Sequence, residues 1–169
     1  MLFSLYISDP KISLDPRIVK KSGVFMEKIP DNLKTELWSM FDEYRVVYLA
    51  TSANNIPRVR PVTLVMLDSK FWILTGTNDA KIQQLRENPK VELCLPIEEG
   101  ENTGYARFGG SIQIINDRET RKRIAENVDY FGNYWKTPDD PKYTLLAAEF
   151  EEVEYMEPGQ NSSEKYRFS

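Results

Sequence analysis

The stretch RVVYLATSANNIPRVRPVTLVMLDSKFWILT, residues 45–75, decides the fold of this chain. It contains three runs rich in β-branched and aromatic residues, at 45–51, 57–67 and 70–75, separated by short turn-forming segments. Runs of this kind bounded by Asn, Asp and Ser are typical of strands joined by tight turns. The stretch therefore predicts three consecutive antiparallel strands.

Outside this meander, the same kind of pattern predicts three more strands, at residues 91–95, 105–115 and 143–155, with an acidic loop at 96–103 after the first of them. Helical spacing of apolar residues, each preceded by a capping residue, predicts three helices. Their expected caps are Asp31, Asn78 and Asn116. Six strands with helices between and beside them favour a mainly β fold with peripheral helices (α+β), built on a six-stranded antiparallel β-barrel.

The length and composition favour one domain. A chain of 169 residues with 41% hydrophobic residues can bury one sizeable core. Residues 1–30 contain Pro10, Pro16 and Pro30 with little periodicity, so we expect an N-terminal extension at 1–30 and a single domain at 31–169. No apolar run approaches the roughly 20 residues that span a bilayer, which predicts a soluble protein.

The residue types exclude several classes of function. A net charge of −4 argues against a broad nucleic-acid or anionic-membrane surface. There is no histidine, so Ser-His-Asp hydrolysis and a histidine-based metal site are excluded, and we expect neither a metal nor a protein nucleophile. The single cysteine, Cys94, lies in an apolar run and indicates strand packing in a reducing cytoplasm.

Lys81 is unusual because it lies in the first turn of the helix predicted from Asn78. An ammonium group there opposes the helix dipole, whereas the free N–H groups of a helix N-terminus bind anions. A phosphate contacted by Lys81 would reconcile the two. The alternative is that Asp79 satisfies the dipole while Lys81 points into water.

Arg58 and Arg60 are two residues apart and so lie on one face of a strand, where guanidinium groups could bind phosphate oxygens. A solvent-facing pair is the alternative. Pro61 inside the strand predicts a sheet edge or a bulge, because proline has no N–H to donate to a neighbouring strand. A planar ring bonded to the backbone of Val62 and Thr63 would suit such an edge.

These residues, with the strand before Thr75 and the segment Asn88-Pro89-Lys90-Val91, resemble the pyridoxamine 5′-phosphate oxidase-like, FMN-binding split-barrel family over residues 33–155. The resemblance implies a split β-barrel that forms homodimers with two FMN sites at the subunit interface. It implies that Arg60 and Lys81 hold the FMN phosphate, and that Val62, Thr63 and Thr75 line the flavin.

The chain also departs from that family. Ala80 stands where strict oxidases have a second basic residue, Tyr105 lies near the position of a flavin-contacting glutamine, and residues 157–169 have no arginine-rich substrate segment. The aromatic run that ends at Trp135 could form a wall of a flavin or substrate pocket, or could fill a core or an interface. The resemblance therefore supports flavin binding more than oxidation of pyridoxamine 5′-phosphate.

We therefore expect a cytoplasmic, homodimeric FMN-binding flavoprotein that moves electrons or hydride between a reduced donor such as NAD(P)H and a small acceptor. A non-catalytic flavin carrier or redox sensor, or a reductase that binds the deazaflavin F420, are alternatives. Haem is disfavoured because the chain has no histidine ligand. The candidate cofactor-binding residues are Arg58, Arg60, Pro61, Val62, Thr63, Thr75, Asn78, Lys81, Tyr105 and Trp135.

Overall fold

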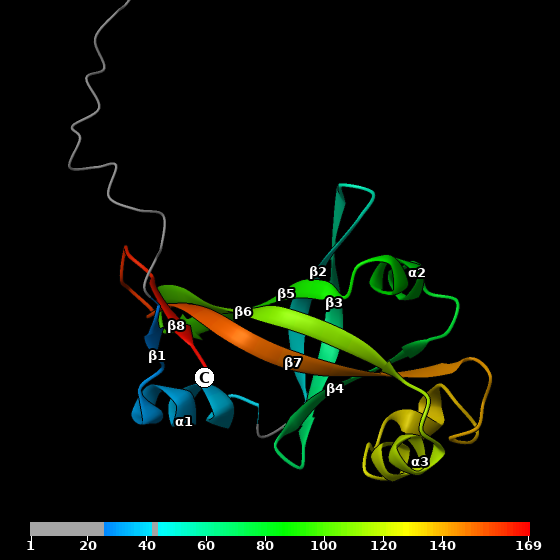
Figure 1. Ribbon diagram of the computed structural model, residues 1–169. Helices are drawn as coiled ribbons and strands as arrows, with labels where there is room; N and C mark the ends of the chain where they lie inside the picture. Colours follow the sequence, from blue (N-terminus) through cyan, green and yellow to red (C-terminus); the bar gives the residue numbers. More distant parts are fainter. Residues whose placement is uncertain (1–25, 42–43) are drawn as a thin grey trace, which may run out of the picture.

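The computed structural model describes residues 26–41 and 44–169 of a mainly β chain (Figure 1). Residues 1–25 of the expected N-terminal extension lie outside this part. The elements in chain order are β1 (Glu27–Lys28), α1 (Asp31–Ser39), β2 (Arg45–Ala53), β3 (Ile56–Leu67), β4 (Lys70–Gly76), α2 (Ala80–Glu87), β5 (Lys90–Glu99), β6 (Asn102–Ile115), α3 (Arg118–Glu126), the 3-10 turn η1 (Phe131–Asn133), β7 (Tyr143–Met156) and β8 (Glu164–Arg167).

The strands form one sheet in the order β1-β8-β7-β4-β3-β2-β5-β6, and an additional pairing of β6 with β7 closes six of them into a ring. Every neighbouring pair within this ring is antiparallel. The six ring strands are those that the sequence predicts. β1 and β8 were not predicted; they pair in parallel at the end of the sheet, and β8 pairs with β7.

Within the ring, the shortest run of paired residues is the one between β3 and β4. These two strands pair only where Val65–Leu67 faces Lys70–Trp72, next to their tight turn. Earlier in β3, Pro61 pairs with Tyr48 of β2 on one side, and no described strand pairs with it on the other. The prediction of an edge at Pro61 is thus confirmed, and β3 and β4 are separated by an open seam.

Two hydrophobic cores lie on opposite faces of the strands. The larger core fills the ring, and Leu37 and Phe41 at the end of α1 extend it. The smaller core lies on the outer face of β4 and β7, where α3 and η1 cover Trp72 and Leu145. Because α3 and η1 pack there, the segment after α3 is held close to the open seam.

Each of the three helix caps differs from its prediction by one residue. α2 begins at Ala80 with Asp79 as its N-cap, so the prediction that Asn78 caps it is wrong. α3 is capped by Asp117, whose carboxylate accepts the N–H of Thr120 at 2.8 Å, and not by Asn116. In α1, Asp31 is the first helical residue and does not cap the helix.

The acidic segment 96–103 is also more regular than predicted. β5 continues to Glu99 and β6 begins at Asn102, so the two strands form a tight hairpin. Gly100 occupies the turn with φ +61°, a conformation that favours glycine. None of the helices in the described part of the chain has the length and apolar character needed to traverse a lipid bilayer.

Candidate functional site

A cleft of about 690 Å³ opens at the seam between β3 and β4. Its walls come from four places in the chain, namely the start of β2, the open edge of β3, the end of β4 with the N-terminus of α2, and the segment around η1. Six of the ten candidate residues line it: Pro61, Val62, Thr63, Thr75, Lys81 and Trp135. The volume lies within the range of small-molecule and cofactor sites.

A polar network occupies the end of the cleft at α2. Lys81 Nζ donates to Thr75 Oγ1 at 2.7 Å and to Asp79 Oδ2 at 2.6 Å. The same Asp79 oxygen accepts the Thr75 hydroxyl at 2.6 Å and the Gly76 N–H at 3.2 Å. Hydrogen bonds from Lys81 and Thr75, which favour the charged form, lower the pKa of the Asp79 carboxyl below its ordinary value. Asp79 is therefore ionised and is the counter-ion of Lys81.

The interpretation in which Asp79 satisfies the helix dipole while Lys81 points into water is wrong, whereas a contact of Lys81 with a phosphate stays a prediction. The Lys81 side chain does not point into water, since it is only 12% exposed and extends back to the end of β4. Asp79 is the N-cap of α2, yet its side chain makes no hydrogen bond to the N–H groups of the helix. The carboxylate is turned toward Lys81 and Gly76. The network thus places a buried cation and a helix N-terminus side by side at one end of the cleft.

The opposite end of the cleft is apolar and aromatic. The open edge of β3 contributes Val62 and Thr63, and the segment around η1 contributes Tyr130 and Tyr134. The Tyr130 hydroxyl is buried and has no hydrogen-bond partner among the described residues. Burial, together with the neighbouring Tyr44 and Tyr134, raises its pKa to about 12. At neutral pH the Tyr130 phenol beside the cleft is therefore protonated, and its O–H is buried in the wall and not exposed to the cleft.

The aromatic run that ends at Trp135 contributes both to the smaller core and to the wall of the cleft. Phe131 and Trp135 are buried in the smaller core, and the Trp135 indole N–H donates to the Lys142 carbonyl at 3.2 Å. Tyr134 is 71% exposed at the rim. Trp135 also lines the cleft, so it joins the core to the candidate site.

The arginine pair does not line the cleft. Arg60 donates to Thr51 Oγ1 and Gln84 Oε1, both at 2.7 Å. Gln84 lies three residues after Lys81, one turn further along α2. Arg58 lines a smaller hollow beside the same helix. Burial and the adjacent Arg58 charge lower the pKa of Arg60. The two cations thus lie next to α2 but outside the cleft.

Asn78 and Tyr105 also lie elsewhere. Asn78 is exposed in the turn before α2. Tyr105 lies on β6, where its hydroxyl donates to Glu154 Oε1 at 2.7 Å. Their proposed contacts with a cofactor, like those of Arg58 and Arg60, stay predictions.

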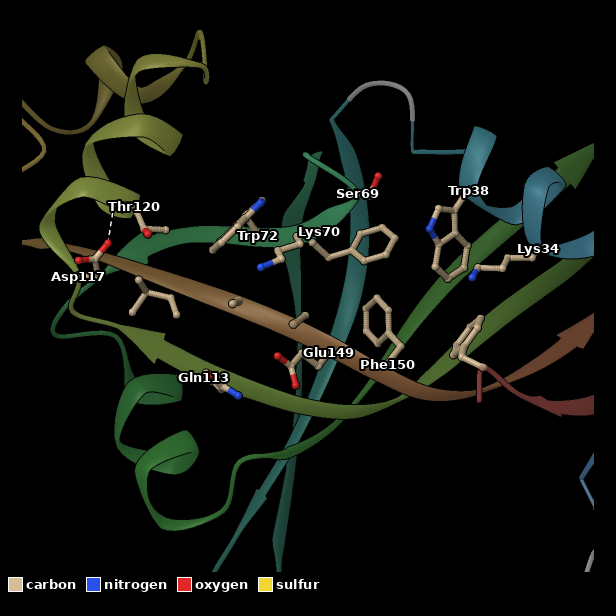
Figure 2. A pocket seen from close by; sticks show the side chains of 15 residues that line it. Lys34, Trp38, Ser69, Lys70, Trp72, Gln113, Asp117, Thr120, Glu149 and Phe150 are labelled. Atoms are coloured by element: carbon tan, nitrogen blue, oxygen red, sulfur yellow. Dashed lines mark hydrogen bonds between the residues drawn. The ribbon is translucent and has the colours of Figure 1, made fainter. Parts of the chain in front are cut away.

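A second hollow, of about 450 Å³, runs along β7 between α1 and α3. Figure 2 shows Lys34 and Trp38 at one end, Asp117 and Thr120 at the other, and Glu149 between them. Its charges are mixed, and the N-terminus of α3 that it reaches is already capped by the Asp117 carboxylate. This groove therefore lacks the uncapped helix end and the buried cation that distinguish the cleft at the seam.

The family model for pyridoxamine 5′-phosphate oxidase matches residues 33–157, which are 125 of the 169 residues. The chain therefore belongs to this family. No curated protein matches the chain.

Solved structures share the fold. One is a NimC/NimA family protein from Clostridium acetobutylicum, with 24% identity and a TM-score of 0.62 over 78% of this chain and 90% of that one. A protein from the same organism, related to general stress protein 26 of B. subtilis, has 22% identity and a TM-score of 0.69, covering 82% and 96%. An FAD-binding protein from Mesorhizobium loti has 17% identity and a TM-score of 0.61, covering 78% and 96%.

Proposed function

We propose that this protein is an FMN-binding flavoprotein that transfers electrons between a reduced donor such as NADH or NADPH and a small acceptor. The observation that carries the proposal is the cation of Lys81 beside the N-terminus of α2, which has no side-chain cap hydrogen bond, at one end of a cleft whose other walls are largely apolar. Such an arrangement suits a ligand with a phosphate at one end and a flat ring at the other. Membership of the pyridoxamine 5′-phosphate oxidase family and a structural neighbour that binds FAD support it.

The residues of the cleft fit the two ends of FMN. Lys81, with the N–H groups of α2, would hold the phosphate, and the buried Thr75 hydroxyl would support it. The unpaired side of β3 at Val62 and Thr63 would offer backbone groups to the ring, and the Tyr130 and Trp135 side chains would form an aromatic wall beside it. A bound flavin itself supplies the redox chemistry, so the protein needs only to position it and to exclude water.

A homodimer belongs to the same proposal. Large hydrophobic side chains are exposed on the outer face of β2 and β3 and just before β2, near the cleft: Tyr44, Val46, Tyr48 and Val59. A contiguous exposed apolar surface of this kind is typical of an interface. A second copy packed there would cover the open seam, and the ring of six strands would then be the split barrel of an interfacial flavin site.

The proposal is tested by an absorption spectrum of the purified protein and by titration with FMN. We expect the purified protein to show the spectrum of a bound flavin. We expect the Lys81→Met substitution to raise the dissociation constant for FMN about 10- to 100-fold, because it removes a hydrogen bond from a charged group. The matched control is Lys142→Met, at the rim of the same cleft. Unchanged FMN affinity in folded Lys81→Met would contradict the phosphate role.

The competing functions differ in simple observables. Oxidised flavin and F420 have different absorption spectra, so the spectrum decides between these two cofactors. An oxidoreductase and a carrier then differ in whether NADH or NADPH bleaches the bound flavin at a useful rate. We expect bleaching.

A further inference from the structure

The Asp79 carboxylate occupies the position in the cleft at which a ligand anion would be held. Three donors converge on its Oδ2 atom: Lys81 Nζ at 2.6 Å, the Thr75 hydroxyl at 2.6 Å and the Gly76 N–H at 3.2 Å. An ammonium, a hydroxyl and a backbone N–H are the groups that hold a phosphate oxygen at a helix N-terminus. The cleft thus contains its own anion, supplied by the chain.

A phosphate can reach Lys81 only if this carboxylate moves aside. The Lys81 side chain is 12% exposed, so little of the ammonium is accessible while Asp79 is paired with it. Asp79 is 47% exposed and can turn toward solvent. It remains two residues from Lys81, however, and a phosphate group carries between one and two negative charges near neutral pH. Like charges so close repel each other.

We propose that Asp79 is a specificity-determining residue, which lowers the preference of the cleft for a phosphorylated flavin over the uncharged one. This inference rests on the proposed function, in which the cleft binds a flavin through Lys81. FMN must displace Asp79 from Lys81, and the displaced carboxylate then faces the phosphate. Riboflavin has the same ring and ribityl chain without the phosphate, so it binds without breaking the Asp79–Lys81 pair.

The test is the ratio of riboflavin to FMN dissociation constants in wild type and in Asp79→Asn, measured by flavin fluorescence at one ionic strength. Asparagine keeps the shape and an acceptor for Lys81 but removes the charge. We expect FMN to bind about 10-fold more tightly to the variant and riboflavin to change by less than about 3-fold. Asp79→Ser, which is also a good helix N-cap, should change the ratio in the same direction.

Two further variants separate this effect from others. Glu87→Gln removes an equal charge at the other end of α2 and should leave FMN affinity unchanged. In a Lys81→Met background, Asp79→Asn should no longer tighten FMN binding, because the two residues act through one contact.

The possible failures have different meanings. If wild type binds FMN and the ratio is the same in both Asp79 variants, the role of Asp79 is overturned while the proposed function stands. If Glu87→Gln tightens FMN binding equally, the effect is one of overall charge and the role of Asp79 is overturned as well. If no variant binds either flavin, the proposed function fails, and the inference fails with it.

Discussion

At the scale of single residues, the carboxylate of Glu154 on β7 accepts more side-chain hydrogen bonds than any other carboxylate in the described part of the chain. Its side chain is 12% exposed. It accepts hydrogen bonds from Tyr105, Lys165 and Ser163, and it pairs with Arg107 at 2.8 Å. Burial raises the pKa of the Glu154 carboxyl, but the hydrogen bonds and the Arg107 charge outweigh burial and lower the pKa to about 2.

This pKa predicts how stability changes in acid. Because the folded pKa lies below the unfolded value of 4.5, the ionised Glu154 stabilises the fold fully above about pH 4.5, and this contribution is lost as the pH falls toward 2. We expect Glu154→Gln to lower the free energy of unfolding by on the order of 2 kcal/mol at pH 7 and by much less near pH 2.5. Urea unfolding at both pH values measures the difference. An equal loss at both values, or a similar profile for the exposed control Glu98→Gln, would contradict it.

The sequence predicted part of the candidate site for reasons that are local. Lys81 was recognised from its place in a helix, and Pro61 from its place in a strand, and both lie in the cleft. In the alternative interpretation Asp79 would serve the helix dipole, whereas its side chain turns back to Gly76. The direction of the Asp79 side chain and the contact of Arg60 with Gln84 both depend on how strands and α2 are placed in space. The spacing of residues along the sequence does not predict this placement.

At the scale of elements, the pairing of β6 with β7 depends on a bulge. The register shifts between Gly109 and Gly110, so that Gly109 faces Glu152 and Gly110 faces Phe150. A Cβ atom on Gly110 would lie 2.0 Å from the Glu149 carbonyl oxygen, a clash with rigid backbone. Only glycine fits there, and the bulge lets two long strands curve around the ring.

We therefore expect Gly110→Ala to destabilise the fold by more than about 2 kcal/mol, because the strands must separate or lose the bulge. The control is Gly132→Ala, where an added Cβ meets nothing within 4 Å and the change should stay within about 0.5 kcal/mol. Thermal or urea unfolding measures both. A Gly110→Ala variant as stable as Gly132→Ala would show that β6 and β7 adjust freely.

The elements themselves were largely predictable, and the errors have physical causes. The six ring strands have strong apolar patterns, but β1 and β8 are two and four residues long and bury little, so no pattern indicates them. The caps of α2 and α3 were misplaced because Asn and Asp adjoin each other at both sites, and either residue type can cap a helix. Which one does so is decided by the backbone of the preceding strand.

At the scale of the whole molecule, the proposed dimer makes a prediction about the exposed face of β2 and β3. Val59 is 66% exposed there, so a glutamate in its place costs nothing in a monomer but would bury a charge in an interface. We expect light scattering to give a dimer for wild type and for the control Val59→Thr, and a monomer with weaker FMN binding for Val59→Glu. A wild-type monomer that binds FMN stoichiometrically would refute the interfacial site.

The last prediction concerns the reaction for which the family is named: this protein should oxidise pyridoxamine and pyridoxine 5′-phosphate poorly. Such substrates carry a phosphate of their own, which requires a second group of cationic donors beside the flavin ring. Among the described residues that line the cleft, the cations are Lys81, assigned to the cofactor phosphate, and the exposed Lys142. The C-terminal segment 157–169 supplies no others, because none of its residues lines the cleft and its β8 is bonded to the far part of β7 at Glu152–Tyr155.

Without a second phosphate site, the substrate carbon would rarely reach a reactive position against the flavin. We expect FMN-loaded protein mixed with either substrate to form hydrogen peroxide and pyridoxal 5′-phosphate far more slowly than the roughly 1–10³ s⁻¹ typical of enzymes. Reduction of the same sample by NADH or NADPH is the control that its flavin is active. Turnover within the enzymatic range would show that Lys142 alone suffices to bind the substrate phosphate. The proposal that the flavin in this cleft reacts with molecules other than these two substrates would then be wrong.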